Sequence, residues 1–221
     1  MKPLLLDILA CPICKYYPLK LEILKWETSE NKFTKILEAY KNKDFDYLTK
    51  ETKIRRGKDR VDDAVSITGN GEIILKDEMV RTQSKVQDYL TEVVLKLENF
   101  QVIGDLSEGG YSVCLDLIKS KIITRFLDAK SEIADKKTQK KIVEDIKPDI
   151  YLLNWFFQFS EIEEGIIHCE KCARWYPIIE TIPQMLPDDL REKEAEIDFL
   201  EKWKAKIPKK ISEEGKPFNL K

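Results

Sequence analysis

The side chains with the clearest capacity for chemistry in this chain of 221 residues are two pairs of cysteines. Cys11 and Cys14 form a Cys-Pro-Ile-Cys motif, and Cys169 and Cys172 form a Cys-Glu-Lys-Cys motif. Four thiolates are a ligand set of tetrahedral Zn²⁺, with Zn–S distances near ~2.3 Å. One C-x-x-C motif alone could be a redox site, but two such pairs, each beside strand-like sequence, favour structural zinc. A site closed by four protein ligands has no open position for water, so catalytic zinc is not expected.

The single histidine and the fifth cysteine are better explained as packed side chains than as functional groups. His168 precedes Cys169, and it would have to displace a cysteine to become a metal ligand. Cys114 lies on a predicted apolar helix face with Leu115 and Ile118. A buried thiol is the expected role there, because the sequence has no second histidine to activate a nucleophile.

Short strands and one helix are predicted around the two motifs. Leu19–Trp26 alternates apolar and polar residues, which is typical of a half-buried strand. Residues 165–168 and 174–179 predict two short strands around a knuckle turn. The apolar run of residues 1–10 contains Asp7 and has no cleavage site, so it predicts a short helix and not a signal peptide.

A metal ion held by both cysteine pairs would join the start of the chain to a segment near its end. The fold class expected is therefore α+β, with a small zinc-ribbon-like antiparallel sheet and the N-terminal helix in one lobe. Residues 1–28 and 161–187 would form this discontinuous zinc-binding lobe. Residues 29–160 would form an inserted, mainly helical lobe, and residues 188–221 a C-terminal helical extension and tail.

Apolar residues recur at helical spacing through the middle of the chain. The four predicted faces are Phe33, Ile36, Leu37 and Tyr40; Val86, Tyr89, Leu90, Val93, Val94 and Leu97; Leu115, Ile118, Ile122 and Phe126; and Ile142, Ile146, Tyr151, Leu152, Trp155 and Phe156. Pro148 should kink or restart the last of these helices. The Gly-Asn-Gly within residues 65–75 suggests a hairpin, or else a loop, and residues 104–110 are predicted to be a linker between helices.

Beyond residue 187 the pattern predicts one more helix. Asp188 could cap it, Leu190, Ile197, Leu200, Trp203 and Ile207 would share a face, and Pro208 would stop it. The last dozen residues are polar and are expected to be loose.

Composition narrows the class of protein. The 38 basic and 40 acidic side chains give a formal net charge of -2, whereas a domain that grips nucleic acid unaided is usually clearly basic. No stretch approaches the ~18 consecutive apolar residues of a membrane helix, so no membrane contact is expected. A cytoplasmic location is the default without an export signal, and cysteines there stay reduced and bind metal more readily than they pair.

The residues around the cysteines carry a family resemblance. MKPLLLDILACPIC at residues 1–14 and EGIIHCEKCARWYPIIETIPQMLP at residues 164–187 together resemble the Trm-type methyltransferase-activator family (Trm-one-twelve). The specific part is the order of Tyr176, Pro177, Ile178 and a later Ile-Pro pair behind the second C-x-x-C. Two departures are a central region longer than in compact members and an extension after residue 187.

That resemblance implies a function. Members are non-catalytic subunits that form heterodimers with class I S-adenosylmethionine-dependent methyltransferases, which modify tRNA, rRNA or a translation release factor. The activator stabilises its partner, carries zinc, binds no methyl donor and meets RNA or release factor only indirectly. Contact with the enzyme is made by the zinc lobe, through a strand added to the edge of the enzyme's sheet.

The residues themselves suggest where such a partner would bind. A strand bounded by prolines offers free backbone groups and apolar side chains, which suits strand addition to a partner. Such a docking surface would consist of Leu5, Ile8, Leu9, Ile178, Ile179, Ile182, Pro183, Met185 and Leu186. The plainer interpretation is that some of these side chains pack the lobe's own core.

Two other classes of function compete. A zinc-ribbon module that binds nucleic acid is the main alternative, because basic and aromatic residues gather near the motifs. They are Lys15, Tyr16, Tyr17, Lys20, Lys171, Arg174 and Trp175. An enzyme is less favoured, since GDLSEGG at residues 104–110 lacks the strand-before, helix-after setting of a dinucleotide site.

Overall fold

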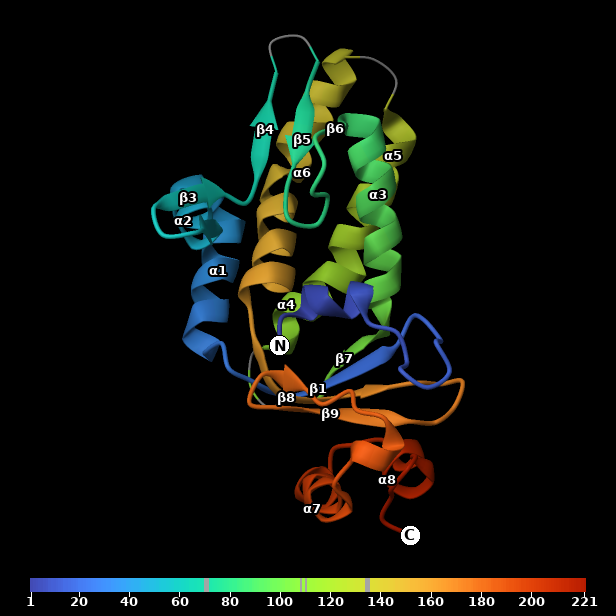
Figure 1. Cartoon of the computed structure of the whole chain (residues 1–221). Coiled ribbons are helices and arrows are strands. Elements are labelled where there is room, and N and C mark those ends of the chain that lie inside the picture. Colours follow the sequence, from blue (N-terminus) through green and yellow to red (C-terminus); the bar gives the residue numbers. More distant parts are fainter. Residues whose placement is uncertain (70–71, 108, 110, 134–135) are drawn as a thin grey trace. The chain divides into compact units, whose positions relative to one another are not determined.

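The computed structural model describes residues 1–69, 72–107, 109, 111–133 and 136–221. It has the mixed α+β composition that the sequence predicts. The chain divides into two compact units, shown in Figure 1. The cysteine unit comprises Met1–Ser29, Val102–Tyr111 and Glu161–Lys221, and the helical unit comprises Glu30–Gln101 and Ser112–Ser160. Compared with the predicted boundaries, residues 102–111 and the whole C-terminal extension fall within the cysteine unit.

A five-stranded sheet forms the centre of the cysteine unit. Its strand order is β10 (Ile182–Pro183), β9 (Trp175–Ile179), β8 (Ile162–His168), β1 (Lys20–Trp26) and β7 (Ile103–Asp105). The strands predicted on either side of the knuckle and at the start of the chain are confirmed as β8, β9 and β1. All neighbours are antiparallel except β1 and β7, which are parallel. The segment at the start of the chain is a 3₁₀ helix, η1 (Pro3–Ile8).

The parallel edge strand corrects one expectation. Gly104 and Asp105, predicted to begin a linker, lie in β7; residues 108 and 110 of that segment lie outside the described residues. The Trp26 Nε1 donates to Asp105 Oδ2 at 3.0 Å, and the Leu106 amide donates to the Ile23 carbonyl at 2.8 Å. A strand this short is specified by its partner strand and not by its own composition, which explains the error.

The tight turn between β9 and β10 contains two residues other than glycine with left-handed backbones. Glu180 has φ 47° and Thr181 has φ 68°. Positive φ at both central residues is the geometry of a two-residue hairpin turn, where Asn and Gly are usual. The Thr181 amide also donates to the Glu163 carbonyl at 3.0 Å, so a neighbouring strand end helps to hold the turn.

The helical unit confirms the four predicted apolar faces. Every residue of the second and third faces is buried, and Phe33, Ile36 and Leu37 of the first are also buried. Its helical elements are α1 (Glu30–Asn42), α2 (Phe45–Glu51), α3 (Val86–Asn99), α4 (Ser112–Leu117), η3 (Ile118–Ile122), α5 (Ile123–Glu132), α6 (Lys136–Asn154) and η4 (Trp155–Phe159), while η2 (Phe100–Val102) ends at the boundary.

Pro148 does not restart the fourth helix, because α6 runs through it without a break. Proline removes one intrahelical hydrogen bond. Ile146 and Ile150 on either side are buried, so packing of this face outweighs the local cost.

Two small sheets complete the helical unit. β2 (Lys53–Arg56) and β3 (Arg60–Asp63) form an unpredicted hairpin. β4 (Ser66–Thr68), β5 (Ile74–Lys76) and β6 (Ser84–Lys85) form an antiparallel sheet. The pairing of β4 with β5 confirms the predicted hairpin, whose residues 70 and 71 lie outside the described residues.

The C-terminal extension packs on the sheet of the cysteine unit and differs from the single helix predicted there, whose expected face includes Leu190, a residue that is 62% exposed. It forms a turn, η5 (Asp188–Leu190), and two helices, α7 (Lys193–Trp203) and α8 (Lys209–Glu214). Asp188 does not cap α7, whose N-cap is Glu192. Instead, the carboxylate of Asp188 accepts hydrogen bonds from Arg174.

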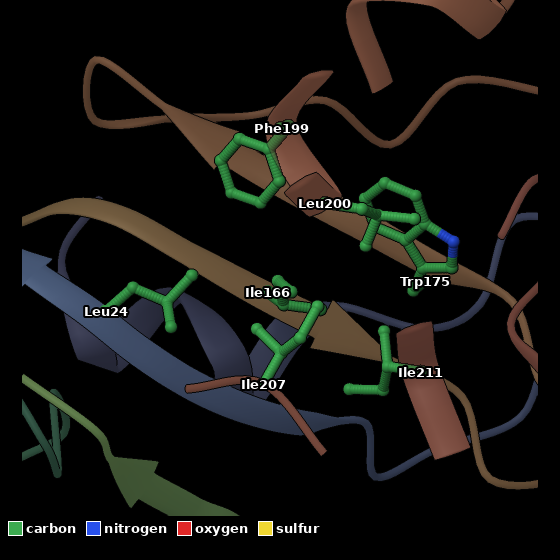
Figure 2. Packing of buried hydrophobic residues seen from close by; sticks show 7 residues of the cluster. All are labelled: Leu24, Ile166, Trp175, Phe199, Leu200, Ile207 and Ile211. Atoms are coloured by element: carbon green, nitrogen blue, oxygen red, sulfur yellow. The ribbon is translucent and has the colours of Figure 1, made fainter. Parts of the chain in front are cut away.

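The end of the chain is docked, not loose. Leu200 of α7 and Ile211 of α8 are buried against Ile166 and Trp175 of the sheet (Figure 2). The Trp175 Nε1 donates to the Phe218 carbonyl at 2.9 Å. These contacts could not be predicted, because the last residues are mostly polar and only a few apolar side chains and backbone groups make them. Among the described residues, none of the helices combines the length and the apolar character of a membrane span.

Candidate metal centre

The four predicted ligands come together at one point of the cysteine unit. The Sγ atoms of Cys11, Cys14, Cys169 and Cys172 all lie within 4.8 Å of one another. The Cys11–Cys172 and Cys14–Cys169 sulfurs are 3.6 and 3.5 Å apart. A tetrahedral site with Zn–S bonds of ~2.3 Å has S···S edges of about 3.8 Å, so the cluster fits an ion of this kind. All four cysteines are free of disulfides.

Each cysteine pair has the same local backbone. The residue after each pair, Lys15 or Ala173, has a left-handed φ of 59°. Its amide donates to the carbonyl of the first cysteine of the pair, from Lys15 to Cys11 and from Ala173 to Cys169, both at 2.9 Å. This turn closes each C-x-x-C loop, so that both sulfurs point to one place.

Side chains behind the cluster favour a charged sulfur at Cys11. Burial opposes ionisation of this thiol, but hydrogen bonds from the Cys14 backbone and the Tyr176 hydroxyl outweigh it and lower the pKa of Cys11 to about 6. The Tyr176 oxygen lies 3.3 Å from the Cys11 sulfur. The guanidinium of Arg191 lies 5.2 Å from the Tyr176 ring centre and is held by Glu196 at 2.6 Å. Partners of this kind orient metal ligands.

A second cation lies beside the other cysteine pair. Arg174 Nη2 is 2.7 Å from Asp188 Oδ2. Hydrogen bonds to Asp188, and to a smaller extent to the Cys172 sulfur, raise the pKa of Arg174. Positive charge is therefore placed next to a sulfur that would carry negative charge when it binds a metal.

With this geometry established, comparison with known proteins gives one match. A family model described as "Trm112p-like protein" matches residues 2–180. The chain belongs to this family. Trm112p-like proteins are non-catalytic activator subunits of methyltransferases. Neither a comparison with curated proteins nor one with solved structures found a match.

The predicted docking residues fall into three groups according to the exposure of their side chains. Leu5, Ile8, Ile179, Ile182 and Leu186 are exposed, with Ile8 at 76% and Ile182 at 59%. Leu9, Pro183 and Met185 are half-buried. Ile178 is fully buried and belongs to the core of the sheet, so its side chain is not accessible to a partner.

Three of the seven residues that supported the alternative of a nucleic-acid-binding zinc ribbon make contacts within the chain itself. Trp175 is fully buried beneath the C-terminal helices. Arg174 is paired with Asp188, and Lys20 with Glu170 at 2.7 Å. These contacts remove three of the seven residues from a basic, aromatic face, while Lys15, Tyr17 and Lys171 stay exposed.

The other two candidates for chemistry are packed. His168 lies outside the sulfur cluster and is mostly buried, and burial lowers the pKa of its imidazole to about 4. Cys114 is fully buried, and burial raises the pKa of its thiol. The residues that the sequence did not single out are Tyr176 as a hydrogen-bond partner of Cys11 and Arg191 behind it.

Proposed function

We propose that this chain is the zinc-binding activator subunit of class I S-adenosylmethionine-dependent methyltransferases that modify tRNA, rRNA or a translation release factor. The proposal rests on the four-sulfur cluster in a chain of the Trm112p-like family. Structural zinc would contribute folding free energy directly, and it would fix the two chain ends that carry the docking residues. A cytoplasmic heterodimer is the form in which the subunit would act.

The proposed docking surface consists of Leu5, Ile8, Leu9, Ile179, Ile182, Pro183, Met185 and Leu186. It combines η1 with the end of the sheet at which β10 is the last strand. A short edge strand whose other side has no neighbouring strand in the sheet can accept a strand from another protein. Apolar side chains beside that edge would be covered in the heterodimer.

Binding would raise the stability of the folded methyltransferase through mass action. A protein that binds only the folded form of its partner stabilises that form by roughly 2.7 kcal/mol at 100-fold excess over the dissociation constant. The activator would also cover an apolar edge that otherwise promotes aggregation. No catalytic group on this chain is required.

A paired substitution tests the docking surface. Ile182→Asp with Met185→Asp should abolish co-purification of methyltransferases, identified by mass spectrometry, while one zinc per chain remains by elemental analysis. A charge placed where a partner must exclude water cannot be accommodated. The matched control is Leu95→Asp with Leu127→Asp, two exposed leucines of the helical unit, which should leave the complex intact.

Three results would count against the proposal. The first is a wild-type chain that recovers no methyltransferase. The second is equal loss of partner in both variants, since this would indicate general damage. The third is loss of zinc from the docking variant, which would show that these side chains belong to the core of the cysteine unit.

A further inference from the structure

The helical unit contains a basic groove for which the proposed activator role gives no use. Two adjoining cavities of about 610 and 850 Å³ share Arg56, Lys76 and Glu78 in their walls. The first extends to Gln158 and the second to Tyr151. Together they make one continuous track over the β2–β3 hairpin and the end of β5.

The walls of this groove are positively charged, although the chain as a whole has a net charge of -2. Three of the lining residues are acidic, namely Asp62, Asp63 and Glu78, and six are basic, namely Arg55, Arg56, Arg60, Lys76, Arg81 and Lys147, which leaves a net charge of +3.

Each acidic residue of the groove is already neutralised by a neighbour. Glu78 pairs with Arg56 at 2.8 Å, Asp62 pairs with Arg60 at 2.8 Å, and Asp63 pairs with Lys53.

Three of the four remaining cations are free to bind a ligand, and the fourth, Lys147, lies 4.4 Å from the centre of the Phe45 ring. Within the part of the chain that the structure describes, Arg55, Lys76 and Arg81 form no ion pair, and all three are exposed. Three uncommitted cations in one concave wall are a site for negative charge.

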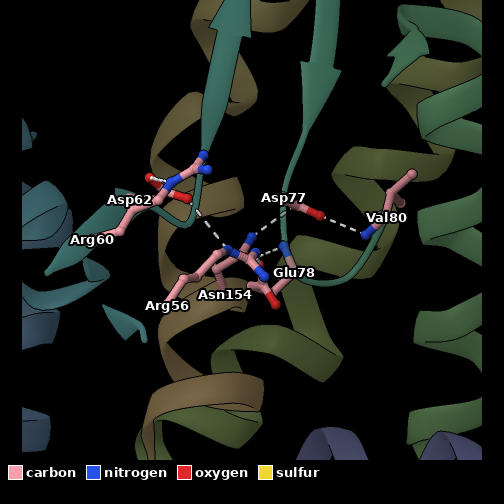
Figure 3. A network of polar contacts seen from close by, with 7 residues as sticks. All are labelled: Arg56, Arg60, Asp62, Asp77, Glu78, Val80 and Asn154. Atoms are coloured by element: carbon pink, nitrogen blue, oxygen red, sulfur yellow. Dashed lines mark hydrogen bonds and ion pairs between the residues drawn. The ribbon is translucent and has the colours of Figure 1, made fainter. Parts of the chain in front are cut away.

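A buried network holds this wall in place (Figure 3). Asp77 is almost fully buried and accepts hydrogen bonds from Tyr89 at 2.6 Å and from the Asn154 amide at 2.7 Å. The Glu78 amide donates to the Asn154 side chain at 2.9 Å. Because Lys76 and Glu78 flank Asp77, the segment that presents the Lys76 ammonium is anchored to α6 and α3.

We propose that the basic groove binds the phosphate backbone of the RNA on which the partner methyltransferase acts. Guanidinium groups bind phosphate oxygens in pairs. Small-molecule pockets are mostly apolar and enclosed, whereas the walls of this groove carry several cations spread over two adjoining cavities. The inference rests on the proposed function for the identity of the RNA, but the groove itself does not depend on the docking surface.

The test removes the three uncommitted charges from the full-length chain. Arg55→Gln, Lys76→Gln and Arg81→Gln are combined, and binding of a fluorescent tRNA transcript is titrated at several salt concentrations. Loss of three phosphate contacts should weaken binding at least about tenfold near 0.1 M salt and reduce the slope of log affinity against log salt by about 2 to 3. The matched control combines Lys35→Gln, Lys41→Gln and Lys50→Gln, three exposed lysines of the same unit outside the groove, and should bind tRNA like the wild type.

The outcomes separate this inference from the activator role. Groove and control variants should both retain the methyltransferase in co-purification. Equal tRNA affinity and salt slope in the wild type and the groove variant would overturn the groove while leaving the activator role untouched. Groove-dependent binding to anionic lipid vesicles without tRNA binding would also overturn it. If no methyltransferase co-purifies with the wild type, the activator role fails whatever the groove variant shows.

Discussion

Replacing Leu200 by alanine should detach the C-terminal helices from the sheet of the cysteine unit. Leu200 is fully buried in a cluster with Ile166, Trp175 and Ile211 (Figure 2). The substitution removes three buried carbon atoms, worth about 2.4 kcal/mol at ~0.8 kcal/mol each. A residual cavity adds to this, and the total for a buried leucine is about 3 to 5 kcal/mol. The matched control is Leu190→Ala, because Leu190 is 62% exposed and should cost less than about 0.5 kcal/mol.

Hydrogen exchange followed by mass spectrometry can localise this effect. A local loss of 3 kcal/mol corresponds to roughly 100-fold faster exchange through the opening of α7 and α8. Peptides from the helical unit should keep their protection, because the cluster lies within the cysteine unit. Equal protection in the Leu200 and Leu190 variants would refute the docking of the extension on the sheet.

Two further predictions concern the metal centre and its surroundings. Cys14→Ser should reduce the zinc content and the thermal stability of the cysteine unit, because the metal contributes folding free energy. The control, Cys114→Ala, should retain one zinc per chain. Equal zinc in both variants, measured by elemental analysis, would exclude Cys14 as a ligand. Asp188→Asn should lower the free energy of unfolding by about 0.5 to 1 kcal/mol at pH 7, since Asp188 is about one-third exposed and its pair with Arg174 is partly screened. Arg174 lowers the pKa of the Asp188 carboxyl below its usual 3.8, so this contribution is present above that pH and is lost as pH falls through the folded pKa. Denaturant titrations from pH 7 to pH 2 should therefore show the two proteins converging, and a difference that persists in strong acid would contradict the pairing.

The parts of the fold that follow from sequence are those specified by local pattern. Four cysteines in two C-x-x-C motifs predict one cluster whatever lies between them, because the chemistry of the ligands sets the geometry. The period of apolar residues in α3 predicts its buried face, since packing against that face stabilises the helix. The alternation in β1 does the same for a strand.

The parts that do not follow depend on partners distant in the chain. β7 is three residues long and contains Gly104, and only its parallel pairing with β1 makes it a strand. Asp188 has the composition of a helix cap, yet a pair with Arg174 stabilises it elsewhere. The last residues are predicted to be loose because only a few of them are apolar, and their contacts are those of Ile211 and Leu220 with the core cluster and of backbone groups with Trp175 and its neighbours.

The same distance limits what can be predicted of the sites. Tyr176 was visible in the motif, but its hydrogen bond to Cys11 spans 165 positions. The basic groove is invisible in the sequence because its unpaired charges come from β2, β5 and the segment after it, and acidic residues lie between them along the chain. Only the folded structure shows which of these charges form ion pairs and which do not.

The separation of the two cysteine pairs has a consequence for biosynthesis. Cys14 and Cys169 are 155 positions apart, so at 5–20 residues per second the ribosome needs about 8 to 30 s to make the second pair after the first. During that interval the nascent chain exposes two thiols that can hold a metal only weakly. The helical unit ends at Ser160, so all of it is synthesised before the second cysteine pair, and closure of the cluster would follow the synthesis of that unit.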